Sequence, residues 1–125
     1  MASDKLTQFA GQKYLNLESY RKSGDAIRTP LWFAQGDGVL YFYTVAHSYK
    51  VKRLQNNPRA RIAPCDIRGN VTGEWIAATA RRLDDNEARH ANGLLNRKYG
   101  WQKRLLNFFA KLRGHQRAAF AIQPD

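Results

Sequence analysis

The 125-residue chain has few of the residues that build a self-contained catalytic centre. Its one cysteine, Cys65, cannot form an internal disulfide, and its three histidines, His47, His90 and His115, have no cysteine or carboxylate at metal-ligand spacing. The glycine motifs of Rossmann and P-loop proteins are also missing. These absences argue against a metal site and against a nucleotide-binding α/β fold.

The chain also lacks a long hydrophobic run. No apolar stretch approaches the ~20 residues that a membrane-spanning helix requires, and the N-terminus lacks the apolar centre of a signal peptide. The single cysteine fits a reducing compartment. We therefore predict a cytoplasmic protein without a membrane partner, folded as one domain over residues 1–125.

Acidic residues are scarce, with 10 Asp and Glu against 21 Lys and Arg, so the net charge is +11. Seven of the basic residues lie between Arg97 and Arg117, a segment with no Asp or Glu. Such a segment attracts polyanions, nucleic acid included. However, Trp101, Leu105 and Phe109 interleave with the charges at helical spacing and are needed for packing. An acidic ligand tail or simple solubility is therefore favoured over nucleic acid.

What is present is a series of short strand patterns followed by helix patterns. Gly36-Asp37-Gly38 lies between two apolar runs and predicts a hairpin turn. We expect a mainly β protein of antiparallel strands, with two helices in the C-terminal half and a closing strand. The predicted strands are 14–20, 28–34, 39–45, 59–63, 75–83 and 118–122, and the two helices are 84–99 and 101–112.

The strand 39–45 is apolar on both faces, since Leu40 and Phe42 alternate with Tyr41 and Tyr43. Both faces must therefore be covered. In a chain this short, we expect one face to lie on the core and the other on a partner subunit, which predicts a homodimer.

Ser48 follows this strand and precedes a short basic segment that ends before Pro58. Ser48 is placed to cap a helix whose first turn has unpaired N–H groups and the positive end of the peptide dipole. With Lys50 beside it, this turn is a candidate phosphate site. An ordinary capped helix with solvated lysines explains the same residues.

The order of several motifs resembles a known family. Arg28-Thr29-Pro30-Leu31-Trp32-Phe33 precedes the Gly-rich hairpin, and Leu40-Tyr41-Phe42-Tyr43-Thr44, Ser48-x-Lys50 and Asn57-Pro58-Arg59-x-Arg61 follow. This arrangement is similar to the flavin and deazaflavin split β-barrel family related to pyridoxamine 5'-phosphate oxidase, in particular its small branch assigned to coenzyme F-420. The resemblance covers nearly the whole chain and implies a split β-barrel.

The resemblance also implies the cofactor site. Lys50, Ser48 and Thr44 fall where the family binds the cofactor phosphate, and Arg28 contributes from the neighbouring strand. The backbone of residues 29–33 corresponds to the strand beside the flavin ring. Tyr49 replaces the second basic residue that many members have before the lysine. The predicted cofactor-binding residues are Arg28, Thr29, Pro30, Leu31, Trp32, Phe33, Tyr43, Thr44, Ser48, Tyr49 and Lys50.

A phosphate site without an acid/base pair or a metal cluster suggests that a cofactor supplies the chemistry. The C-terminus lacks the Trp, Arg and His that hold pyridoxal phosphate in true pyridoxamine-phosphate oxidases. We expect a homodimeric oxidoreductase that uses coenzyme F-420 to transfer hydride to an unsaturated organic substrate in a cleft at the subunit interface. FMN is the alternative cofactor, and no catalytic residue is assigned. Non-catalytic flavin or haem binding and nucleic-acid binding are the other hypotheses.

Overall fold

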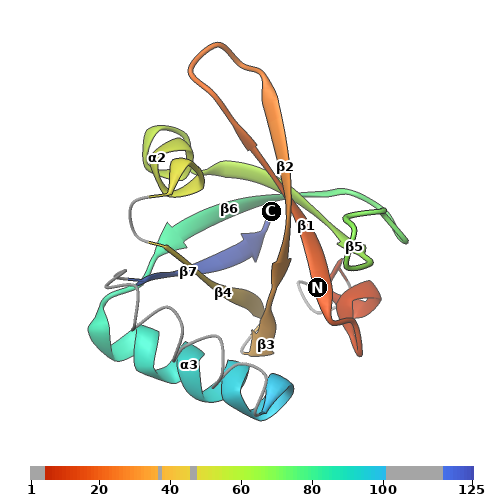
Figure 1. Cartoon of the computed structure of the whole chain (residues 1–125), viewed down its shortest axis with the longest axis vertical. Helices are drawn as coiled ribbons and strands as arrows, with labels where there is room; N and C mark the ends of the chain where they lie inside the picture. The colour runs from red at the N-terminus through yellow and green to blue at the C-terminus, as the bar shows by residue number, and fades with distance from the viewer. Residues whose placement is uncertain (1–4, 37, 46–47, 101–116) are drawn as a thin grey trace.

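Seven antiparallel strands form one curled sheet in the computed structural model, which describes residues 5–36, 38–45, 48–100 and 117–125 (Figure 1). The strand order is β2-β1-β5-β6-β7-β4-β3. The strands are β1 (Tyr14–Tyr20), β2 (Ala26–Trp32), β3 (Ala34–Gly36), β4 (Val39–Val45), β5 (Arg59–Cys65), β6 (Ile76–Arg82) and β7 (Arg117–Pro124). The helical elements are the 3₁₀ turn η1 (Thr7–Phe9) and the helices α2 (Tyr49–Asn56) and α3 (Asp85–Tyr99).

The predicted strands and helices are confirmed over most of the chain. β1 and β4 begin and end where the sequence pattern placed them, and β3 and β4 form the predicted hairpin, in which Gly36 pairs with Val39. The strand expected over 28–34 is divided, because β2 ends at Trp32 and β3 begins at Ala34. The helix expected over 101–112 lies outside the described residues.

The concave side of the sheet holds the main core. Phe42 of β4 stacks on Phe120 of β7, with ring centroids 5.3 Å apart, and Phe33 meets Phe9 edge to face. Leu15 and Leu17 of β1 are also buried there. Because alternate residues of a strand point to opposite faces, this core uses one face of every long strand and leaves the other face to be covered separately.

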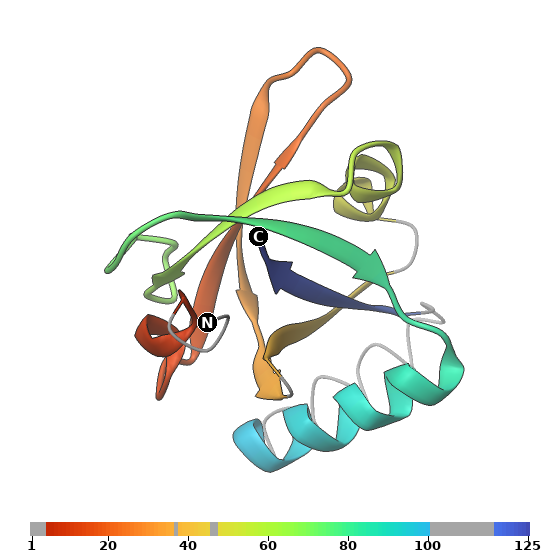
Figure 2. The ribbon, with the colours of Figure 1, turned by 180° about the vertical axis from the view of Figure 1, so that it is seen from behind.

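Helix α3 covers the outer face of β4 and β7. Tyr41, Ala119 and Ala121 on the strands form a cluster with Ala91 of α3, and Leu94 packs against it. The views from the front and from behind agree that α3 runs along this side of the sheet (Figures 1 and 2). Intramolecular packing therefore covers the face that we assigned to a partner subunit, and the apolar pattern of β4 does not require a dimer.

Both helices begin at the caps that the sequence predicted. The Ser48 side chain accepts a hydrogen bond from the Val51 N–H at the start of α2. At the start of α3, Asp84 and Glu87 exchange bonds, with the Glu87 N–H 2.8 Å from Asp84 Oδ1 and the Asp84 N–H 3.3 Å from Glu87 Oε1. This reciprocal arrangement is a capping box. In the described part of the chain, neither helix is long and apolar enough to cross a membrane.

Candidate functional site

The end of β4 and the first turn of α2 bring three of the predicted phosphate ligands together. The Lys50 ammonium donates a hydrogen bond to Thr44 Oγ1 at 3.1 Å, and Thr44 Oγ1 lies 3.4 Å from Ser48 Oγ. The Val51 N–H points to the same Ser48 hydroxyl at 3.4 Å. We call Thr44, Ser48 and Lys50 the phosphate cradle. It combines two hydroxyls, an ammonium and the N-terminal end of a helix, which are the usual ligands of a phosphate.

The charge of the cradle is not balanced by an acid. Lys50 is half-buried, and among the described residues no carboxylate forms an ion pair with it. Burial, and then the charge of Arg53, lower the pKa of Lys50. A cation that is partly removed from water without a partner is unfavourable unless an anion joins it. This unbalanced charge favours a ligand site over an ordinary capped helix.

Arg28 is placed differently from the other predicted phosphate ligands. Its Nε donates to Glu18 Oε2 at 2.9 Å, and Arg61 binds the same carboxylate through Nε at 2.8 Å and Nη2 at 3.1 Å. Both guanidinium groups also lie over the Trp75 ring, 4.8 Å and 5.3 Å from its centroid. We call Glu18, Arg28, Arg61 and Trp75 the Glu18 cluster. The Arg28 side chain is still about half exposed. Its contact with the cofactor phosphate stays a prediction.

Glu18 itself is buried, with 2% of its surface exposed. The hydrogen bond from Arg61 lowers the pKa of its carboxyl to about 2, supported by bonds from Tyr20 and Arg28 and opposed by burial. Glu18 is therefore charged at neutral pH and offsets one of the two positive charges that bind it. The sequence analysis missed this residue, because its partners come from two other strands, β2 and β5, that pair with β1 at this level.

The predicted ring-binding segment, residues 29–33, lies at an edge of the sheet. β2 pairs with β1 on one side, and no other described strand pairs with its second side. Backbone groups of an edge strand can bind a ligand as they would bind a further strand. The side chains of Leu31 and Phe33 are buried in the main core, while Thr29 is half-buried and Pro30 is exposed. The backbone of this segment, more than its core side chains, is available to a ring.

Trp32 and Tyr43 meet on the other side of the sheet. Both pack against a small cluster of Ala34 and Leu95. The Tyr43 hydroxyl donates to the carbonyl of Ala88 in α3 at 2.6 Å. The structure thus places these two predicted cofactor-binding residues beside α3.

Lys98 of the basic segment lies against an aromatic ring, a contact that the sequence did not predict. Its ammonium lies 3.5 Å from the centre of the ring of Phe33, the last residue of the predicted ring-binding segment. Desolvation lowers the pKa of Lys98 to about 8. The other basic residues of this segment, apart from Arg97 and the backbone of Arg117, lie outside the described part of the chain. The proposal that this segment serves an acidic tail remains a prediction.

Cys65 is buried, and this burial, followed by the charge of Asp66, raises the pKa of its thiol. A raised thiol pKa disfavours the thiolate that a nucleophile needs. His90 is exposed on α3 and lies beside Tyr41, with ring centroids 5.9 Å apart. His47 and His115 lie outside the described residues. In the described ranges, no three His, Cys, Asp or Glu residues gather as metal ligands would.

No protein-family model and no curated protein matches the sequence. Solved structures do match the fold. The haem-storage protein HutZ of Vibrio cholerae superposes with a TM-score of 0.74 at 14% identity, over 98% of this chain and 89% of that one. A FAD-binding protein of Mesorhizobium loti gives 0.65 at 16%, over 100% and 88%. A pyridoxamine 5'-phosphate oxidase-like protein of Listeria innocua gives 0.63 at 14%, over 99% and 93%.

The fold is therefore the split β-barrel of the pyridoxamine 5'-phosphate oxidase type, as the motif order predicted. The likeness extends over almost the whole chain, so the curled sheet, α2 and α3 form one recognised architecture. At 14–16% sequence identity, these structural matches establish the fold alone. Function must be argued from the site.

Proposed function

We propose that this protein is an oxidoreductase that binds a phosphorylated flavin-type cofactor, with the cofactor phosphate in the cradle of Thr44, Ser48 and Lys50. The observation that carries the proposal is the half-buried Lys50 ammonium, which has a hydroxyl as its described partner and no carboxylate. The structural neighbours that bind FAD or resemble pyridoxamine 5'-phosphate oxidase support a flavin-type cofactor.

The residues present fit such a cofactor. The cradle would hold the phosphate, and the free backbone edge of β2 over residues 29–31 would lie along the ring. Arg28, on the same strand, would add charge near the phosphate. The bound cofactor would supply hydride transfer, which no described side chain of this protein can carry out. The protein's own part is to bind, orient and exclude water.

Within this class we propose deazaflavin coenzyme F-420 as the cofactor, used to transfer hydride to a small organic substrate, with FMN as the alternative. The resemblance of the Arg28 to Phe33 motif supports F-420, and the net charge of +11 suits its acidic tail. We also propose a homodimer with the substrate cleft at its interface. Sedimentation at micromolar concentration should give twice the 14.4 kDa chain mass, and a monomer that binds cofactor would refute the interface cleft.

Haem binding is the second candidate, because two solved neighbours are haem proteins, HutZ and a haem-binding protein of Mycobacterium smegmatis. Haem carries two carboxylates, which could occupy a cationic site, but its iron also requires an axial ligand. The described residues offer His90, exposed on α3, and the buried Cys65.

The deciding experiment is a titration of the purified protein with F-420, FMN and haemin, followed by absorption and calorimetry. We expect saturable binding of F-420 or FMN with a one-to-one stoichiometry per chain. Tight haemin binding with a sharpened Soret band and no flavin or deazaflavin binding would overturn the proposal. Activity is then tested by the reoxidation of the reduced cofactor with candidate unsaturated substrates.

A further inference from the structure

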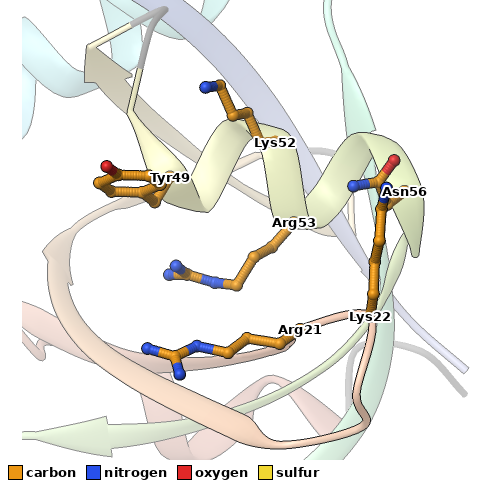
Figure 3. Close-up of a pocket in the computed structure, with 6 residues that line it drawn as sticks. All are labelled: Arg21, Lys22, Tyr49, Lys52, Arg53 and Asn56. Atoms are coloured by element: carbon orange, nitrogen blue, oxygen red, sulfur yellow. The ribbon is translucent and has the colours of Figure 1, made fainter.

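A basic groove lies beside the cradle, between α2 and the turn that joins β1 to β2. It has a volume of about 420 Å³, within the range of small-ligand sites. Figure 3 shows Arg21 and Arg53 side by side, with the Tyr49 ring at the same end of the groove. Its lining residues include four cations and no acid, and they are Arg21, Lys22, Tyr49, Lys52, Arg53 and Asn56.

The fold holds the two guanidinium groups close to one another. Arg53 is fixed by a hydrogen bond from its Nε to Ser19 Oγ of β1 at 2.8 Å. Burial, and then the charge of Arg21, lower the pKa of Arg53, so the two cations repel each other across the groove. The acidic residue of the same turn, Asp25, accepts a bond from Ser23 instead. An anion between the two guanidinium groups would relieve the repulsion.

The groove adjoins the cradle. Lys50 and Arg53 are three residues apart on α2, which places neighbouring side chains about 5–6 Å apart at Cβ. The charge of Arg53 also lowers the pKa of Lys50, which shows that the two sites interact. A ligand with two linked anionic groups could therefore bind both sites at once.

Tyr49 adds an aromatic surface at the entrance. It is the most exposed large hydrophobic residue described, at 78%, and the Lys52 ammonium lies 5.6 Å from its ring centroid. It occupies the position where the resembling family often has a basic residue. An exposed ring beside an anion site is a platform on which a nucleobase can stack.

We infer that the groove is a second anion-binding site, which takes the second phosphate of a dinucleotide cofactor such as FAD, with the adenine against Tyr49. The inference rests on the proposed function, because it places the first phosphate in the cradle. Within the flavin-type class of the proposed function, FAD would then take the place of F-420 and FMN, because the cradle would hold one phosphate of any of the three and the groove would favour the one with a diphosphate and a base.

The test compares FAD with FMN by titration calorimetry on the wild-type protein and three variants. We expect FAD to bind at least ten-fold more tightly than FMN, because of the added charge-assisted contacts. Arg21→Gln should weaken FAD binding about five-fold or more while changing FMN binding less than two-fold, and Tyr49→Ser should weaken FAD binding more than it weakens FMN binding. Arg68→Gln, an exposed arginine on the turn between β5 and β6, is the control and should change neither.

Arg53→Gln should have the largest effect on FAD, but it also removes the bond to Ser19. For this reason the exposed Arg21 and Tyr49 decide the test. Equal affinities of FAD and FMN, or equal losses for both ligands in Arg21→Gln, would overturn the inference. Tighter binding of F-420 with a longer oligoglutamate tail, lost in Arg21→Gln while FAD gains nothing over FMN, would assign the groove to carboxylates instead and overturn it too.

Inorganic pyrophosphate separates failure of this inference from failure of the proposed function. If the groove is an anion site, pyrophosphate should bind the wild-type protein, lose affinity in Arg21→Gln, and bind regardless of whether any flavin does. Flavin binding without any pyrophosphate or FAD preference would retain the proposed function and reject the groove. A mixed-sequence oligonucleotide that binds more tightly than FAD at physiological salt would show a nucleic-acid surface and reject the dinucleotide.

Discussion

The Glu18 cluster and the phosphate cradle both hold basic residues at the sheet, but they differ in how the charge is balanced. In the Glu18 cluster, two arginines share one buried carboxylate and stack on Trp75. In the cradle, a half-buried lysine has a threonine hydroxyl as its described partner. Basic residues that bind a carboxylate stabilise the fold, whereas a partly buried cation without a carboxylate is a candidate anion-binding site. The difference separates structural from ligand-binding basic residues without reference to any homologue.

The largest expected effect is a loss of protein stability when the Glu18 cluster is disrupted. Glu18→Gln removes the carboxylate that both arginines bind, and we expect the free energy of unfolding to fall by about 2–3 kcal/mol, less than for a fully buried pair because the arginines are half-exposed. Urea unfolding measures the loss. Glu87→Gln, at the exposed Arg81 pair, is the control and should cost much less, because water screens the charges of an exposed pair. Equal losses would break the distinction between buried and exposed pairs.

The same residue predicts a pH dependence. The Glu18 carboxyl has a pKa of about 2 in the folded protein against 4.5 normally, so its stabilisation is complete above about pH 4.5 and is lost as the pH falls towards 2. Thermal unfolding of wild type and Glu18→Gln between pH 6 and 2 should therefore converge at the acid end. A constant difference at every pH would show that Glu18 acts through packing instead of charge.

A smaller effect is expected for Arg28, which has one atom in the Glu18 cluster and a predicted contact with the phosphate. Arg28→Ala should lower stability by roughly 1 kcal/mol. It should also weaken cofactor binding about two- to three-fold, since half of the side chain remains exposed. Paired unfolding and binding measurements sharpen the comparison: a loss of affinity without a loss of stability would move Arg28 wholly to the cofactor site.

The smallest effect concerns Lys98. Its folded pKa of about 8 lies below the usual 10.5, so the unfolded chain binds more protons between these values and stability should rise with pH across that window. Melting temperatures should rise more steeply with pH in the wild type than in Lys98→Met. The same slope in both proteins would assign it to another group.

Local patterns predicted those parts of the fold that depend on neighbours in sequence. The Ser48 cap, the Gly36 to Gly38 hairpin and the strand from Val39 to Val45 each follow from a few adjacent residues, and all are confirmed. The cover on the outer face of that strand could not be predicted in the same way. The apolar pattern demanded a cover, but only the docking of α3 shows that the chain itself supplies it.

The parts of the candidate site also differ in whether their residues are close together in the sequence. The cradle comes from seven consecutive positions, Thr44 to Lys50, and the motif over these positions predicted it. The Glu18 cluster and the basic groove depend on strands and turns distant in sequence, such as Arg21 against Arg53. One signal was available: Tyr49, Lys52, Arg53 and Asn56 follow the spacing of a single helix face, and they line the groove.

The central claim is that the lysine of the cradle, more than the carboxylate-bound arginines of the Glu18 cluster, provides the charge that binds the cofactor phosphate. Lys50→Ala tests it directly by calorimetry with F-420 and FMN, with Lys5→Ala, exposed near η1, as the matched control. We predict a ten- to hundred-fold loss of affinity for the bound cofactor, from a charge-assisted contact of about 1.5–3 kcal/mol, with no loss of folding stability. Unchanged affinity for both cofactors in Lys50→Ala would contradict the account.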